Sequence, residues 1–139
     1  MTDPFVDTDV IIRLLTQDDP RKEAQAAALF EQVEAGSLTL QAPDTVIADA
    51  VYVLASARLY RKSHAEVRDL LTPLVRLPGF QVRNKRAVLR ALEVYGGTNV
   101  DFGDAMIVAA MELDGADILY SYDRDFDRFP QVKRLEPSL

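Results

Sequence analysis

The sequence predicts an α/β protein built on a mostly parallel sheet. Helical patterns alternate along the chain with short apolar segments, which is the order typical of this fold class. The chain has 139 residues, of which 48% are hydrophobic and 27% charged, so it can bury a core of ordinary composition. It shows no repeat, linker or low-complexity tract, and we therefore expect one domain over residues 1–139.

The first elements are a weak strand and a well-marked helix. Phe5-Val6 could be a short strand, while residues 10–15 fit either strand or helix by pattern alone. Asp19-Pro20 predicts the N-cap and first residue of a helix that ends at Gly36. The apolar residues of this helix share one face: Ala26, Leu29, Phe30 and Val33.

The middle of the chain predicts a strand followed by two helices. Leu38 and Leu40 mark the strand, and a helix follows over about residues 45–60 with Asp44 as its N-cap. Ser63 and Glu66 have the spacing of a capping box at the start of the next helix. The apolar face of that helix comprises Val67, Leu70, Leu71 and Leu74, and Pro73 is expected to kink or stop it.

The last third of the chain repeats the strand and helix pattern. We expect a strand at residues 80–82 and then a helix capped by Asn84 and closed by Gly96-Gly97. Asp101 caps a further helix whose segment 105–111 is apolar on every side, so this helix belongs in the interior. The final strands are expected at residues 116–120 and 132–135.

Four aspartates accompany these apolar segments and suggest one acidic site. They are Asp7, Asp49, Asp104 and Asp123. Asp7 and Asp123 follow strands, and ligands of open α/β sheets bind at the carboxyl ends of strands. Because clustered carboxylates repel one another, such a site needs a cation, and an all-oxygen site suits Mg²⁺ or Mn²⁺. A metal in this setting can activate water for phosphodiester hydrolysis.

Each of these acids also has a purely structural interpretation. Asp7 fits a turn or capping residue, and Asp49 could lie on an exposed helix edge instead of being buried among its apolar neighbours. Asp104 could interact with its own helix N-terminus. Asp101 fits the capping role better, which leaves Asp104 free to face a site.

The segment after the strand at residues 116–120 offers more than one candidate. Asp125 competes with Asp123, and either could be surface charge; we favour Asp123 because it comes first after the strand. Ser121 offers a hydroxyl near the same strand end.

Composition excludes several other kinds of site. The chain has no cysteine and one histidine, His64, which argues against disulfides, zinc sites and a serine-histidine hydrolase. A net charge of −6 argues against non-specific coating of nucleic acid. Two basic clusters are either solvated helix faces or flanks that steer a polyanion: Arg58, Arg61 and Lys62, and Arg83, Lys85, Arg86 and Arg90. We see no secretory signal or membrane segment and expect a cytoplasmic protein.

Four segments together resemble the PIN-domain ribonucleases, and most closely the VapC-type toxins of bacterial toxin-antitoxin pairs. The segments are Val6-Asp7-Thr8-Asp9-Val10, Ile47-Ala48-Asp49, Asp101-Phe102-Gly103-Asp104-Ala105 and Ser121-Tyr122-Asp123-Arg124-Asp125-Phe126. The resemblance implies a three-layer α/β/α sandwich with a central parallel sheet and Mg²⁺-dependent endonucleolytic cleavage of RNA. It also implies homodimers and a small antitoxin that blocks the site, often with an arginine.

The resemblance assigns roles to individual residues. Asp7 and Asp104 match the acids most directly associated with the metal, Asp123 matches the fourth acidic position, and Ser121 matches the accompanying hydroxyl. The chain departs from the family pattern at Asp49, where glutamate is usual, and at Asp9, where asparagine is common. The shorter Asp49 side chain withdraws its carboxylate by about one methylene, which bears on a second metal position and on activity.

Two alternatives differ in class. Asp7-Thr8-Asp9 has the Asp-x-Asp arrangement of haloacid-dehalogenase-like phosphotransferases, with Asp7 as the nucleophile. Ile11 departs from that family's pattern, and no downstream lysine motif is evident. The other alternative is a non-catalytic PIN-like binding module, which the presence of Asp7, Asp104 and Asp123 argues against.

Overall fold

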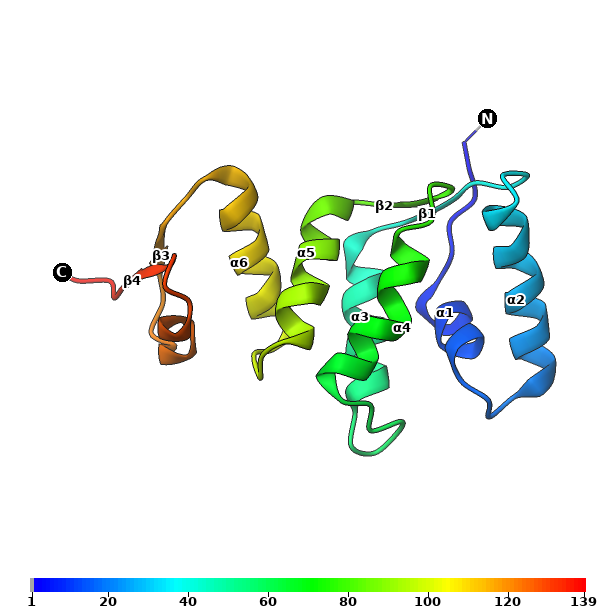
Figure 1. The fold of residues 1–139 in the computed structure, drawn as a ribbon, viewed down its shortest axis with the longest axis horizontal. Helices are drawn as coiled ribbons and strands as arrows, with labels where there is room; N and C mark the ends of the chain where they lie inside the picture. The colour runs from blue at the N-terminus through cyan, green and yellow to red at the C-terminus, as the bar shows by residue number, and fades with distance from the viewer. Residues whose placement is uncertain (1) are drawn as a thin grey trace.

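Helices make up most of the structure, a computed structural model that describes residues 2–139. The elements are α1 (Thr8–Leu15), α2 (Pro20–Glu34), β1 (Leu40–Ala42), α3 (Asp44–Ala55), α4 (His64–Val75), β2 (Phe80–Val82), α5 (Lys85–Gly96), α6 (Phe102–Asp114), β3 (Ile118–Tyr120), the 3₁₀-helix η1 (Arg124–Arg128) and β4 (Lys133–Leu135). Figure 1 shows them in sequence along the long axis, from α2 and α1 through α3, α4 and α5 to α6 and the last strands. The predicted α/β class is confirmed.

The strands pair in parallel, as predicted, and they form two hydrogen-bonded pairs. β1 pairs with β2, and Phe5 adds a parallel bridge to Gln41 on the other side of β1. β3 pairs with β4 beyond α6, at the opposite end of the molecule from α2 (Figure 1). The sequence led us to expect one central sheet, and the described residues instead form two separate parallel strand pairs.

Local capping signals explain why the helices begin where they do. The Asp19 carboxylate accepts a hydrogen bond from the Lys22 amide at 3.1 Å, and Pro20 is the first residue of α2. Gly36, just after α2, has a φ of +82°, a left-handed conformation that glycine adopts without a Cβ clash. The capping box of Ser63 and Glu66 is complete, so these predictions are confirmed.

The helices α3 and α4 differ from the predicted lengths. α3 ends at Ala55 and not near residue 60, because residues 56–63 turn back so that the Lys62 amide donates to the Leu54 carbonyl at 2.9 Å. α4 continues two residues past Pro73, so the proline does not stop it. Asp44 is the first residue of α3 and not its cap, and its carboxylate accepts from the Asn84 amide group at 2.9 Å.

The predicted caps of α5 and α6 occupy the expected positions without making the expected bonds. Asn84 precedes α5 in a left-handed conformation, φ +56°, which asparagine tolerates better than most residues. Asp101 precedes α6 in an extended conformation, and its carboxylate makes no capping hydrogen bond. The carboxylate of Asp101 therefore remains available to other groups.

The core runs through the middle helices and under β1 and β2. Its largest fully buried side chains include Phe80, Ile11, Ile47, Leu54, Leu71 and Leu92. The interior position predicted for α6 is confirmed on one face, where Ala105, Val108 and Ala109 are buried, while Ile107 remains 40% exposed. Among residues 2–139, no helix is both long enough and apolar enough to cross a membrane.

Candidate metal centre

Asp104 lies in the first turn of α6, where it is partly buried. Burial raises the pKa of its carboxyl, and the negative charges of Asp123, Asp101 and Asp125 raise it further. The structure therefore brings the start of α6 close to the loop that follows β3. Two of the predicted site residues, Asp104 and Asp123, belong to this group of acids.

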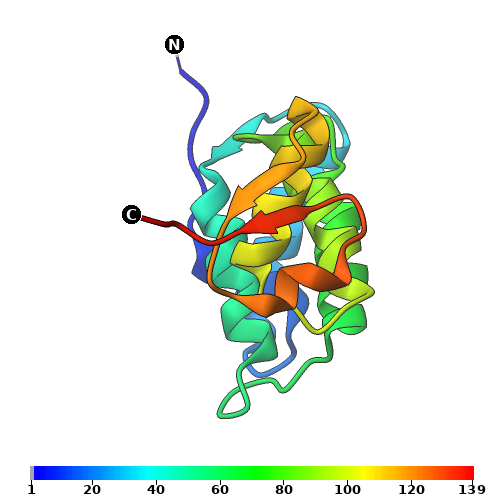
Figure 2. The same cartoon turned by 90° about the vertical axis from the view of Figure 1, so that its left-hand side faces the viewer.

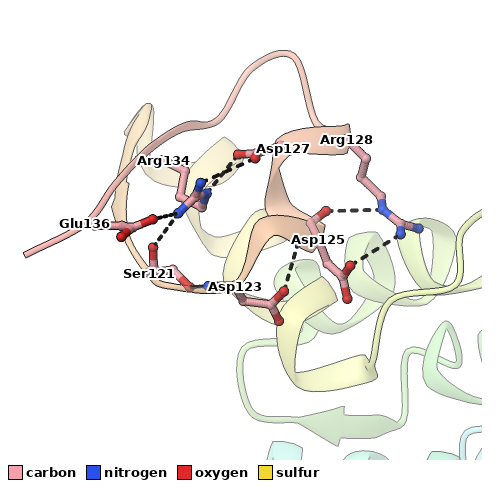
Figure 3. A network of polar contacts seen from close by, with 7 residues as sticks. All are labelled: Ser121, Asp123, Asp125, Asp127, Arg128, Arg134 and Glu136. Atoms are coloured by element: carbon pink, nitrogen blue, oxygen red, sulfur yellow. Dashed lines mark hydrogen bonds and ion pairs between the residues drawn. The ribbon is translucent and has the colours of Figure 1, made fainter.

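Ser121 and Asp123 shape the loop after β3. The Ser121 hydroxyl accepts a hydrogen bond from the Asp123 amide at 3.0 Å, and the Asp123 carboxylate accepts from the Asp125 amide at 2.8 Å (Figure 3). These short-range bonds start η1 and fix the direction of the loop. The Ser121 hydroxyl thus positions Asp123, and one oxygen of Asp123 is used within the loop.

Arg134 on β4 ties this loop to the last strand. Its Nε lies 2.8 Å from Asp127 Oδ1, and its Nη1 donates to the Glu136 carboxylate and the Ser121 carbonyl, each at 3.0 Å (Figure 3). The Arg134 side chain is only 12% exposed. The hydrogen bonds from Arg134 hold the pKa of Asp127 below its usual range.

Sequence reasoning missed Arg134. The available signal was a basic residue in a short strand that follows an acidic segment, and this pattern is common on protein surfaces. Only the fold shows that Arg134 binds Asp127 and so helps to hold Asp123 in place.

Asp7 lies away from this group of acids. It caps α1, where its carboxylate accepts from the Thr8 amide at 2.7 Å, and it is exposed. α1 packs against α2 and α3, whereas α6 packs chiefly against α5; in Figure 1 the helices α3, α4 and α5 lie between α1 and α6. The structure therefore supports the capping interpretation of Asp7 and does not bring it to Asp104.

Asp49 is exposed on α3, although Ile47 and Ala50 beside it are fully buried. The expectation that Asp49 is buried was wrong. A helix turns by about 100° per residue, so one polar position in an apolar run can face solvent while its neighbours face the core.

The chemistry of the acids near α6 suits a hard divalent cation. Within residues 2–139 no three histidine, aspartate or glutamate side chains form a ready-made metal site. Mg²⁺ does not require one, because it commonly binds one or two carboxylates and fills its remaining positions with water and substrate phosphate. Burial chiefly, and the neighbouring negative charges in addition, raise the pKa of Asp104, and a cation beside Asp104 and Asp123 would neutralise those charges.

The two basic clusters have different roles in the structure. In the second cluster, Arg90 pairs with Glu112 at 2.6 Å and with Glu93 at 2.9 Å. Lys85 donates to the carbonyls of Leu77 and Phe80 at 2.7 and 2.8 Å. These two cations stabilise the fold. The first cluster, Arg58, Arg61 and Lys62, lies in the loop between α3 and α4.

Comparison with known proteins identifies the class of this chain. The PIN domain family matches residues 5–132, so the chain belongs to that family. PIN domains are generally nucleases, and PIN nucleases act on RNA or DNA. The six helices and parallel strands are consistent with the three-layer α/β/α PIN fold. No curated protein matches the chain.

Proposed function

We propose that the protein is a metal-dependent endoribonuclease whose centre is built on Asp104 and Asp123. The observation that supports this proposal is the partly buried Asp104 facing the acids of the loop after β3 in a PIN domain. A carboxylate kept at an elevated pKa beside like charges is a common property of functional sites.

Asp104 and Asp123 would hold Mg²⁺, with Mn²⁺ as a substitute. When bound, the ion would supply an activated water and neutralise charge on the phosphate. The residues of the chain would hold the two carboxylates in place. α6 fixes the position of Asp104, while Ser121 and Arg134 fix the loop that carries Asp123. No protein nucleophile is needed for hydrolysis of this kind.

Asp7 and Asp49 are the other two acids that we propose for the site. The resemblance to PIN nucleases supports Asp7 as a metal ligand and Asp49 as a site residue. In this structure both are exposed, Asp7 just before α1 and Asp49 on α3, and bringing Asp7 to Asp104 would require α1 and α6 to approach each other. Because the Asp49 side chain is one methylene shorter than glutamate, its carboxylate would contact the metal through a water molecule.

The reaction class is tested by two assays on the same preparation. We expect cleavage of a fluorescent single-stranded RNA with Mg²⁺, no cleavage in EDTA, and no turnover of a phosphate monoester. Asp7→Asn and Asp104→Asn should abolish RNA cleavage without unfolding the protein, as checked by circular dichroism. Monoester turnover with intact RNA would instead support a dehalogenase-like phosphotransferase, and unchanged cleavage in both variants would contradict the assigned acids.

We further propose that the protein is the toxin of a toxin-antitoxin pair acting on RNA in the cytoplasm. The support is its resemblance to VapC-type toxins, which implies homodimers and a small antitoxin. An arginine of the antitoxin could pair bidentately with Asp104 or Asp123 and block the cation site. Expression alone should arrest growth, and coexpression with a short reading frame encoded beside it should restore growth; growth unaffected by expression would contradict this role.

A further inference from the structure

A groove of about 500 Å³ opens between α3, the start of α4, the end of α5 and the start of α6. Its chemically informative lining residues are Tyr52, Ser56, His64, Tyr95, Asp101 and Phe102. Asp101 and Gly103 line the groove and Asp104 follows directly in the chain, so the groove lies beside the proposed metal centre. Its volume falls within the range of about 300–1,000 Å³ typical of ligand pockets.

The floor of the groove is aromatic and held in place. The His64 ring stacks on Tyr95 with centroids 3.8 Å apart, and Phe102 packs edge-on against Tyr95. His64 Nδ1 lies 3.0 Å from the Tyr95 carbonyl, which can only accept, so Nδ1 carries a proton and this bond holds the ring in place.

Tyr52 forms an exposed wall of the same groove. Its side chain is 77% exposed, although it belongs to a helix whose neighbouring residue Val51 is buried. It lies one turn from Asp49 and one turn from Ser56, so these three polar groups share one side of α3. An exposed aromatic ring beside a rigid aromatic floor is the arrangement that stacks an unpaired base.

The charges around the groove indicate which part of a nucleic acid would enter it. The loop that links Ser56 to His64 carries Arg58, Arg61 and Lys62, which suit backbone phosphates. Inside the groove, the negative charge of the Asp101 carboxylate disfavours phosphate. The same carboxylate can accept hydrogen bonds from the amino group of a base.

We infer that this groove binds one unpaired nucleobase of single-stranded RNA, stacked on Tyr52, next to the bond cut at Asp104. This inference rests on the proposed function and names a subsite for its substrate. Because Asp101 is an acceptor, bases with an exocyclic amino group should bind better than uracil.

Binding of short fluorescent RNAs in EDTA, measured by anisotropy, tests the subsite without cleavage. Stacking of one base predicts that Tyr52→Ser weakens single-strand binding about 5- to 150-fold. Tyr52→Phe should bind within about twofold of the wild type, since the ring carries the interaction. Phe5→Ser is the matched control, because Phe5 is 66% exposed and lies outside the groove, and it should bind like the wild type.

Several results would overturn the subsite. These are no binding of single-stranded RNA by the wild type, no loss in Tyr52→Ser, an equal loss in Phe5→Ser, or an equal loss on duplex RNA. The outcomes distinguish the two proposals. RNA binding that depends on Tyr52, without any cleavage in Mn²⁺, would support the base subsite and contradict the proposed nuclease activity. Metal-dependent RNA cleavage, with binding that does not depend on Tyr52, would support the nuclease activity and contradict the base subsite.

Discussion

The carboxylate of Asp123, on the loop after β3, raises the pKa of Asp104 at the start of α6, in addition to the effect of burial. The two residues are distant in sequence and belong to different elements, so their proximity is a property of the fold. Two neighbouring carboxylates repel each other when no cation lies between them, so the negative charge of Asp104 lowers the stability of the folded protein.

In EDTA at neutral pH, Asp104→Asn should be more stable than the wild type. The folded state raises the pKa of Asp104 above its unfolded value, so the wild type loses stability as pH rises through the folded pKa. Thermal melts between pH 3 and pH 8 should show the advantage of the variant growing with pH. An advantage that is equal at all pH values would show that the charge of Asp104 is not responsible.

Arg134→Met should lower the free energy of unfolding, because it removes charged hydrogen bonds to Asp127, Glu136 and the Ser121 carbonyl. Urea unfolding gives the free energy of unfolding. Arg128→Met is the matched control: its ion pair with Asp125 is 3.9 Å long and exposed, so its loss should cost less than about 0.5 kcal/mol. Equal costs in the two variants would contradict the structural role of Arg134.

Glu112→Gln should remove part of the acid sensitivity of the fold. Hydrogen bonding to Arg90 lowers the pKa of Glu112, so its contribution to stability is present above its unfolded pKa and is lost as pH falls through the folded pKa. The wild type should exceed the variant in stability at pH 7, and the difference should shrink toward pH 3. Glu34→Gln, at an exposed position at the end of α2, should show no such convergence.

Gly96→Ala should cost about 1–3 kcal/mol through overpacking, since its new Cβ would lie 2.8 Å from the Cβ of Arg68. Gly103→Ala is the control within α6. Nothing lies within 4 Å of a Cβ at that position, and alanine favours the helix by up to about 1 kcal/mol. Thermal or urea unfolding should therefore shift in opposite directions for the two variants, and a shift in the same direction would contradict this packing.

Short-range patterns in the sequence predicted much of the local structure. The Asp19-Pro20 start of α2 and the capping box of Ser63 and Glu66 depend on residues within one helical turn, so the local sequence specifies them. The end of α3 was mispredicted because apolar spacing continues past Ala55, while the backbone turns back to bond Lys62 to Leu54.

The candidate site was only partly predictable, because it depends on how distant elements pack. Asp104 was identified because it opens an apolar helical segment and Asp123 because it follows a strand, and the structure brings the two together. The same reasoning could not determine that α1, which Asp7 caps, would be separated from α6 by the middle helices, or that Asp49 would face solvent. Figure 2, viewed toward β3 and β4, shows this end of the molecule, where the last two strands and η1 lie over α6.

Titration with Mn²⁺ followed by electron paramagnetic resonance tests the central claim most directly. The wild type should bind Mn²⁺, and both Asp104→Asn and Asp123→Asn should weaken that binding at least about tenfold, since each removes a charged ligand. Asp114→Asn, at the opposite end of α6, should bind like the wild type. Mn²⁺ binding that is unchanged in Asp104→Asn and Asp123→Asn would contradict a metal centre at the start of α6.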